Sequence, residues 1–164
     1  MIKIYIASDH AGVELKSKVV SLLNDSKILP DVRREIFDLG PQSLESVDYP
    51  DYADLVCKKV HGLSLVNTEA DQITSHPAEV GILICGSGQG MAMRANKYQQ
   101  VRAALCWTPE LAKLSREHND ANILCLASRI VDHAICLEIV QTFLKTPFAG
   151  GRHHTRVAKI SQPI

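Results

Sequence analysis

The residues best suited to chemistry form one run, Cys85-Gly86-Ser87-Gly88-Gln89-Gly90. The run follows the apolar segment Val80–Ile84, which predicts a buried strand, and it precedes a predicted helix from about Gly90 to Lys97. Alternating glycines let the backbone approach a ligand closely, and their N–H groups can point at negative charge. A thiol at the amino end of a helix faces the positive end of the dipole, which favours the thiolate. The pattern predicts a thiol base or nucleophile beside amides that stabilise an oxyanion.

Two other functions for this run need a different residue at position 91. A dinucleotide-binding Gly-x-Gly-x-x-Gly turn requires glycine there, and a Cys-x5-Arg phosphatase loop requires arginine, whereas the residue is Met91. The remaining alternative is that Cys85 is an inert buried thiol, which is the interpretation we favour for Cys57, Cys106, Cys125 and Cys136.

Two further polar groups follow or precede predicted strands. Asp9 and His10 come after the strand Ile2–Ala7, and His118-Asn119 ends a predicted helix over Pro109–His118. Asp9 could simply cap a helix, and His118 could simply complement a helix dipole.

The tail after Gly150-Gly151 is rich in cations. Arg152, Arg156 and Lys159 fall on one side at helical spacing. This cluster predicts a phosphate site, with a solvated basic face as the alternative.

Strands and helices alternate along the chain. Further strands are predicted at 35–39, 101–106 and 122–127, and further helices around Leu15–Leu23, around Ala53–Val60 and at 131–145, the last with Ile135 facing inward. Such alternation predicts an α/β fold, a Rossmann-like three-layer αβα sandwich with a five-stranded parallel sheet. Leu65–Pro77 has no clear period and predicts a surface excursion.

Composition limits the class of protein. The 164 residues carry 18 basic and 18 acidic side chains, so the net charge is zero. Such a chain is expected to form one domain, 1–164, with a helical tail from about 150. Neutrality argues against nucleic acid or an anionic membrane as partner. Five cysteines without a Cys-x-x-Cys pair favour a reducing, cytoplasmic compartment.

Several motifs together resemble one family, the ribose/galactose isomerases, and most closely its type B ribose-5-phosphate isomerases. The matching segments, in order and in register, are Ser8–Gly12, Asp48–Pro50, Cys85–Gly90, Ala95–Lys97, Ser115–Asn122, Ser128-Arg129 and Gly151–His153. One branch of the family uses a glutamate after the glycine turn; Cys85 and Met91 place this chain with the cysteine branch. The Leu65–Pro77 stretch is longer than the family usually has.

The resemblance implies a role for each matching residue. Cys85 would be the base that moves a proton between C1 and C2, and His118 would assist opening of the furanose ring. The substrate would be held by Asp9, His10, Gly86, Ser87, Gly88, Gln89, Gly90, Asn119, Arg129, Arg152 and Arg156.

The expected reaction is the interconversion of D-ribose 5-phosphate and D-ribulose 5-phosphate in the pentose phosphate pathway, with no cofactor and no metal. Members of the family are homodimers or homotetramers with sites shared between subunits. Alternatives are an isomerase of six-carbon phosphates (allose 6-phosphate or galactose 6-phosphate) and a non-catalytic phosphosugar-binding module, which would need neither Cys85 nor His118.

Overall fold

The computed structural model describes residues 1–30, 32–60 and 77–162. The strands of this part are β1 (Ile2–Ser8), β2 (Arg34–Asp38), β3 (Glu79–Cys85), β4 (Ala103–Leu105) and β5 (Ile123–Ala127). The helices are a 3₁₀ turn η1 (His10–Gly12), α1 (Val13–Asn24), α2 (Tyr49–Cys57), α3 (Gln89–Ala95), α4 (Pro109–Asn119), α5 (His133–Lys145) and α6 (His153–Ile160). The excursion predicted for Leu65–Pro77 lies, except for Pro77, outside the described residues.

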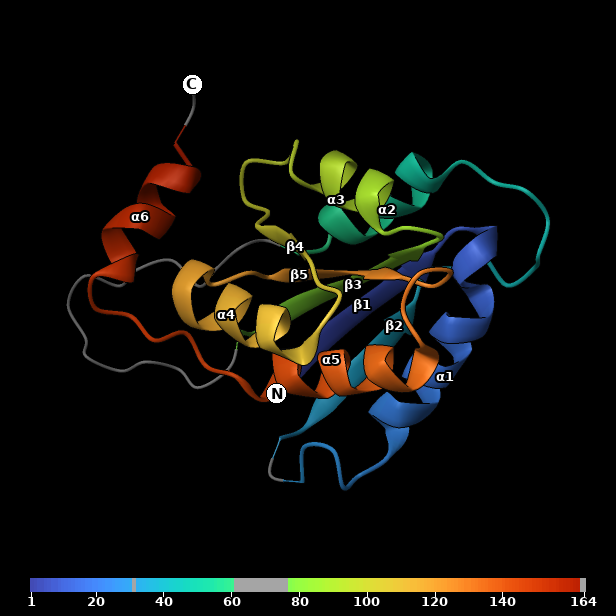
Figure 1. Ribbon diagram of the computed structural model, residues 1–164, viewed down its shortest axis with the longest axis horizontal. Coiled ribbons are helices and arrows are strands. Elements are labelled where there is room, and N and C mark those ends of the chain that lie inside the picture. Colours follow the sequence, from blue (N-terminus) through green and yellow to red (C-terminus); the bar gives the residue numbers. More distant parts are fainter. Residues whose placement is uncertain (31, 61–76, 163–164) are drawn as a thin grey trace.

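The five strands form one parallel sheet in the order β2-β1-β3-β5-β4. Helices α2 and α3 cover one face, and α1, α4 and α5 cover the other (Figure 1). This arrangement confirms the predicted Rossmann-like αβα architecture.

The central strand β3 shows why the sequence folds this way. Every residue from Val80 to Cys85 is buried, because helices cover both faces of the sheet. Ile82 and Ile84 pack toward α1 and α5, whereas Leu83 and Cys85 pack toward α2 and α3. The strand's apolar run therefore contributes to both cores.

Two local expectations were wrong. The strand expected over 101–106 is reduced to β4, because the Arg102 amide donates to the Asn122 side chain (2.8 Å) instead of to a neighbouring strand. Ile135 does not face inward but is 41% exposed, while Ile139 and Phe143 of the same helix are buried. Helix α5 begins at His133, where the side chain of Asp132 caps the Ala134 amide, and Ile135 falls on the solvent side of its first turn.

The order of the strands decides which turns meet. Strand β2 lies on one side of β1, and the next strand, β3, lies on the other side. The strand order therefore reverses between β1 and β3. Ligands of open parallel sheets bind outside the carboxyl ends of the strands at such a point. Ser8 pairs with Ile84 and Cys85 pairs with Ala127, so the turns after β1, β3 and β5 are neighbours.

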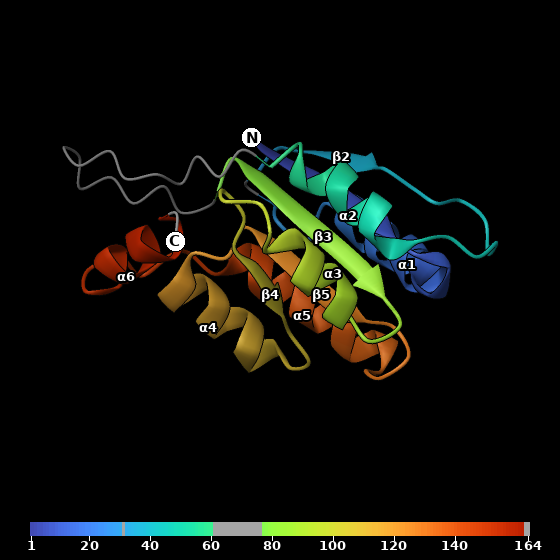
Figure 2. The ribbon, with the colours of Figure 1, turned by 90° about the horizontal axis from the view of Figure 1, so that it is seen from above.

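The opposite, amino edge of the sheet carries the end of α4 and the tail. Helix α4 ends at Asn119, just before β5 begins at Ile123, and α6 lies beside α4 (Figures 1 and 2). In the described ranges no helix is both long and apolar enough to cross a membrane.

Candidate active site

Backbone hydrogen bonds tie together the three turns at the carboxyl edge. The Asp9 amide donates to the Ile84 carbonyl (3.0 Å), the Ser128 amide to the Cys85 carbonyl (2.9 Å), and the Arg129 amide to the Gly86 carbonyl (3.0 Å). The Ser128 hydroxyl also donates to the Ala11 carbonyl (2.9 Å). These bonds give the turns a defined mutual position.

Cys85 lies at the centre of this edge, directly beside the glycine turn. The Gly88 amide donates to the Cys85 Sγ at 3.1 Å. Gly88 has φ +75°, and a Cβ there would lie 2.4 Å from Leu105 Cδ1, so only glycine fits. The backbone of the turn thus directs an N–H group at the thiol sulfur.

The other four cysteines are in a different environment. Burial raises the pKa of Cys57 to about 12 and the pKa values of Cys106 and Cys136 to about 11, and it raises the pKa of Cys125 well above the usual range. All four are therefore protonated, buried thiols near neutral pH, as the sequence predicts.

Asp9 and His10 both interact within the protein. Asp9 Oδ1 accepts hydrogen bonds from the Ala11 amide (2.9 Å) and the Gly12 amide (3.2 Å), so the capping role considered for it is present. The Val47 amide donates to Nδ1 of His10 at 3.3 Å. Both hydrogen bonds of Asp9 use Oδ1, so the capping role occupies one of its two carboxylate oxygens.

Three of the remaining predicted residues of this edge present polar side chains to solvent. Ser87, Gln89 and Arg129 are exposed. The stem of Arg129 runs past the turn, with its Cδ 3.4 Å from the position that a Cβ on Gly86 would take.

Tyr49 is a neighbour of the site to which the sequence assigned no role. A Cβ on Gly90 would lie 2.5 Å from Cζ of its ring, so the aromatic ring rests directly on the glycine turn. Its side chain is 39% exposed. The motif Asp48-Tyr49-Pro50 was the available signal, but nothing local showed that the start of α2 reaches Gly90.

The second cluster of predicted residues lies at the amino edge. The imidazole of His118 stacks on that of His153, with ring centroids 4.4 Å apart and planes 10° from parallel. Arg152, Arg156 and Lys159 are all exposed, whereas His153 and Val157 of α6 are buried. Asn119 lines a cavity of about 250 Å³ between β4 and α6.

One chain does not bring the two clusters together. Cys85 pairs with Ala127, the last residue of β5, whereas His118 precedes the first residue of that strand. Figure 2 shows α6 and the head of the β3 arrow at opposite ends of the sheet. The carboxyl edge thus carries Cys85, Asp9, His10, the glycine turn and Arg129, and the amino edge carries His118, Asn119, Arg152 and Arg156.

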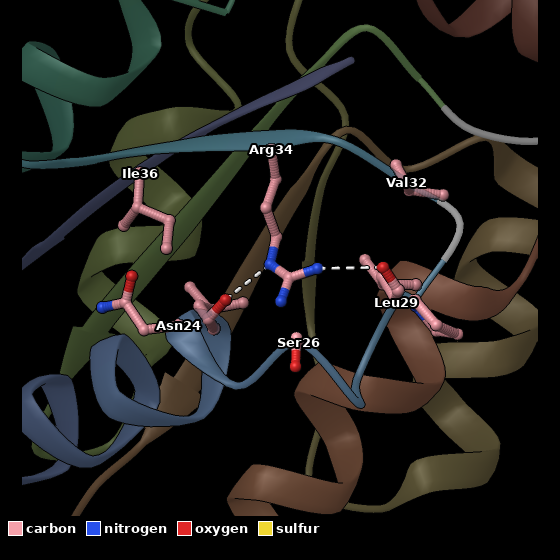
Figure 3. A pocket seen from close by; sticks show the side chains of 8 residues that line it. Asn24, Ser26, Leu29, Val32, Arg34 and Ile36 are labelled. Carbon is pink, nitrogen blue, oxygen red and sulfur yellow. Dashed lines mark hydrogen bonds between the residues drawn. The ribbon is translucent and has the colours of Figure 1, made fainter.

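A further cavity belongs to neither cluster. It has a volume of about 290 Å³ and lies between the end of α1 and β2 (Figure 3). The guanidinium group of Arg34 fills its polar side and donates to the carbonyls of Leu23, Asp25 and Leu29. Three of the five N–H groups of this arginine thus satisfy carbonyls at and after the end of α1.

Position 91 bears on the phosphatase alternative. Met91 is fully buried in the core beneath α3, so the side chain at this position packs against the sheet. Across the described residues no group of three or more His, Cys, Asp or Glu side chains could hold a metal ion.

A family model described as Ribose/Galactose Isomerase matches residues 4–160. The chain belongs to the ribose/galactose isomerase family. The match confirms the family resemblance that the sequence motifs indicated. It spans the residues of both clusters.

Individual members of the family are similar over nearly their whole length. Ribose-5-phosphate isomerase B of Escherichia coli is 38% identical over 161 residues, which are 98% of this chain and 95% of the relative. The solved structure of a ribose 5-phosphate isomerase from Thermotoga maritima is 48% identical with a TM-score of 0.80, covering 98% of this chain and 97% of that one. A structure of the Mycoplasma genitalium ribose-5-phosphate isomerase B with bound ribulose-5-phosphate is 41% identical with a TM-score of 0.82, covering 98% and 94%.

Proposed function

We propose that this protein is a ribose-5-phosphate isomerase that interconverts D-ribose 5-phosphate and D-ribulose 5-phosphate through an enediolate. Relatives and solved structures with this name support it at 38–48% identity over almost the entire chain. The observation that carries the proposal is the Gly88 amide directed at the Cys85 sulfur at 3.1 Å, at the edge of the sheet where ligands bind.

The reaction assigns two transfers of the same proton to Cys85. Its thiolate takes the proton from C2 of the open-chain aldose, the C–H electron pair forms the C1=C2 double bond, and negative charge moves onto O1. The thiol then returns the proton to C1 while the proton on O2 passes to O1, which leaves the C2 ketone. Amides of the Gly86–Gly90 turn are suited to hold the enediolate oxygens, because their dipoles are fixed before charge develops.

The reaction also needs a group that opens the furanose ring and a group that binds the phosphate. The amino-edge cluster supplies both. His118 is the group we assign to moving a proton at the furanose ring oxygen, since an imidazole has one nitrogen that can donate a proton and one that can accept it. Arg152 and Arg156 are suited to bind the phosphate, because their planar guanidinium groups form paired, charge-assisted hydrogen bonds with its oxygens.

A complete site then needs two copies of the chain, with the carboxyl edge of one facing the amino edge of the other. We therefore propose a homodimer, alone or paired into a tetramer, in which each site takes Cys85 from one subunit and His118 from its partner. We also propose a cytoplasmic enzyme of pentose phosphate metabolism; five free buried thiols suit a reducing compartment.

The first prediction concerns Cys85. Cys85→Ala is expected to lower kcat by about a thousandfold, within the range for loss of a general base, while ribose 5-phosphate still binds. The measurement is turnover together with exchange of solvent deuterium into the substrate, followed by NMR.

The matched control is Cys136→Ala, which removes another buried thiol, in α5, and is expected to leave kcat within about twofold because that thiol does not meet substrate. Turnover of the Cys85 variant within tenfold of the wild-type protein would contradict the assignment of the base. Binding without deuterium exchange by the wild-type protein would favour a phosphosugar-binding module, and release of phosphate would favour a phosphatase.

A further inference from the structure

A buried network of three charged side chains adjoins the turn that follows His118 and Asn119. The side chains of Arg102, Arg116 and Asp120 are 5%, 2% and 3% exposed. Asp120 Oδ1 accepts from Arg116 Nη1 at 2.8 Å, and its Oδ2 accepts from Arg102 Nη2 at 2.9 Å. One carboxylate therefore neutralises parts of two guanidinium groups, each of which would be costly to bury alone.

The two arginines also hold backbone groups. Arg102 Nε donates to the Asp120 carbonyl (2.8 Å), and Arg116 Nη1 donates to the Ala121 carbonyl (2.6 Å). These carbonyls belong to the turn between α4 and β5, so the network fixes the path of the chain immediately after Asn119.

Arg116 extends the same network to the tail. Its Nε donates to the Thr146 carbonyl at 3.3 Å, where the segment leading from α5 to α6 begins. Further along that segment, the Ala149 amide donates to the Glu117 carbonyl at 3.0 Å. The last turn of α4, which carries His118, and the segment that leads to Arg152 are thus held to each other.

The backbone at Asp120 is unusual. With φ +46° and ψ +44° it is the one residue other than glycine with positive φ in ranges 1–30, 32–60 and 77–162. Helices often end at such a left-handed residue, and glycine adopts it with the least strain. An aspartate in this place indicates that its carboxylate is needed.

We propose that Asp120 is a positioning residue: through Arg102 and Arg116 it sets the placement of His118 and Asn119 against the tail that carries His153 and Arg152. The proposal rests on the proposed function, because it assigns Asp120 to the same site. Asp120 itself is buried and meets no substrate; it acts through the residues that the network holds.

The test compares two substrates of the full-length enzyme. Ribose 5-phosphate is largely a closed furanose, whereas ribulose 5-phosphate is open because its C5 oxygen carries the phosphate. Loss of label from C1 of ribulose 5-phosphate into solvent therefore reports the proton transfer at Cys85 without ring opening. Turnover of ribose 5-phosphate reports both steps.

Asp120→Gly relieves the backbone strain but removes the carboxylate. It is expected to lower kcat for ribose 5-phosphate by about thirtyfold, since a small misplacement of a catalytic group can cost up to a hundredfold. Label loss from ribulose 5-phosphate is expected to fall by less than about threefold. Asp120→Asn keeps an acceptor oxygen, and asparagine tolerates the left-handed backbone. This variant should therefore recover most of the kcat for ribose 5-phosphate that Asp120→Gly loses.

The control is Val19→Ala, which opens a cavity in the buried face of α1, away from the turn after α4. A variant that is only less stable should lose turnover of ribose 5-phosphate and label loss from ribulose 5-phosphate to the same extent. Val19→Ala is expected to behave in this way. Equal losses in the two assays for Asp120→Gly, or kcat within twofold of wild type, would overturn the proposal.

Two outcomes keep this proposal separate from the proposed function. If Asp120→Gly does not fold, the same comparison is made with Asp120→Asn, for which a threefold selective loss in kcat supports the positioning role and no selective loss overturns it. If the wild-type protein performs neither reaction, it is the proposed function that fails.

Discussion

At the scale of single residues, the stacked pair His118 and His153 links geometry to protonation. Burial of the His153 ring is the first reason that its pKa lies below the usual 6.5, and the nearby positive charges of His118 and the two tail arginines lower it further. The folded protein therefore binds fewer protons at His153 than the unfolded chain does.

This shift predicts a pH dependence of stability with a defined sign. Because the folded-state pKa is the lower one, His153 contributes stability above about pH 6.5, and this contribution is lost as the pH falls toward the folded-state pKa. The free energy of unfolding, measured by urea denaturation between pH 7.5 and 5.5, should decrease more for the wild-type protein than for His153→Gln. Identical pH profiles for the two proteins would show that His153 is not protonated preferentially on unfolding.

At the scale of elements, one buried ion pair joins α1 to the end of β2. The Lys16 ammonium, only 1% exposed, donates to both oxygens of Asp38, which is 28% exposed. Asp38 also accepts from the Gly40 amide (2.9 Å) and from Gln42 Nε2 (3.1 Å). Burial by itself would raise the pKa of Asp38, but the hydrogen bonds from Lys16, Gly40 and Gln42 lower it below its usual value. The pair thus fixes the start of the loop whose Val47 contacts His10.

Because Lys16 is more deeply buried than Asp38, replacing one partner should lower the free energy of unfolding more than replacing the other. Asp38→Asn leaves a buried ammonium without its carboxylate and should cost about 3 kcal/mol in free energy of unfolding. Lys16→Met leaves a carboxylate that water and two other donors can reach, and should cost about 1–2 kcal/mol. Urea denaturation measures both.

The control for this pair is Lys18→Met, which breaks the exposed ion pair with Glu14 and should lower the free energy of unfolding by much less than either of these two variants, because solvent screens exposed charges. Equal costs for Asp38→Asn and Lys16→Met, or costs as small as that of the control, would show that burial does not set the strength of this link.

At the scale of the whole molecule, the two clusters at opposite edges of the sheet make a specific prediction about assembly. Cys85→Ala and His118→Asn subunits should each be nearly inactive alone. In a two-fold dimer with shared sites, a mixed dimer contains one site with both wild-type residues. Coexpression of the two variants should therefore restore about a quarter of wild-type turnover, because half of randomly paired dimers are mixed and each has one intact site of two.

The outcome depends on which chain supplies each group. If Cys85 and His118 of the same chain formed one site, a mixed dimer would contain no intact site and activity would stay at the level of the single variants. Coexpression of Cys85→Ala with Cys85→Ser provides the baseline, since neither subunit can supply the thiol.

Much of this protein follows from its sequence alone. The apolar run at 80–85, the alternation of strands with helices and the motifs from Ser8 to His153 predicted the αβα fold and the family, both confirmed. Burial of Cys57, Cys106, Cys125 and Cys136 was also readable, because apolar neighbours along the chain report a buried segment.

The tertiary structure decided what depends on contacts between distant segments. Insertion of β5 between β3 and β4 brings Ser128 and Arg129 beside Cys85, and no local pattern encodes the order of strands. Tyr49 over Gly90 and the pairing of Asp120 with Arg102 likewise join residues far apart in sequence. Periodicity reports which face of an element is buried, but not which element covers it. The sequence by itself therefore determined the candidate residues, and the fold divided them between two edges of the sheet.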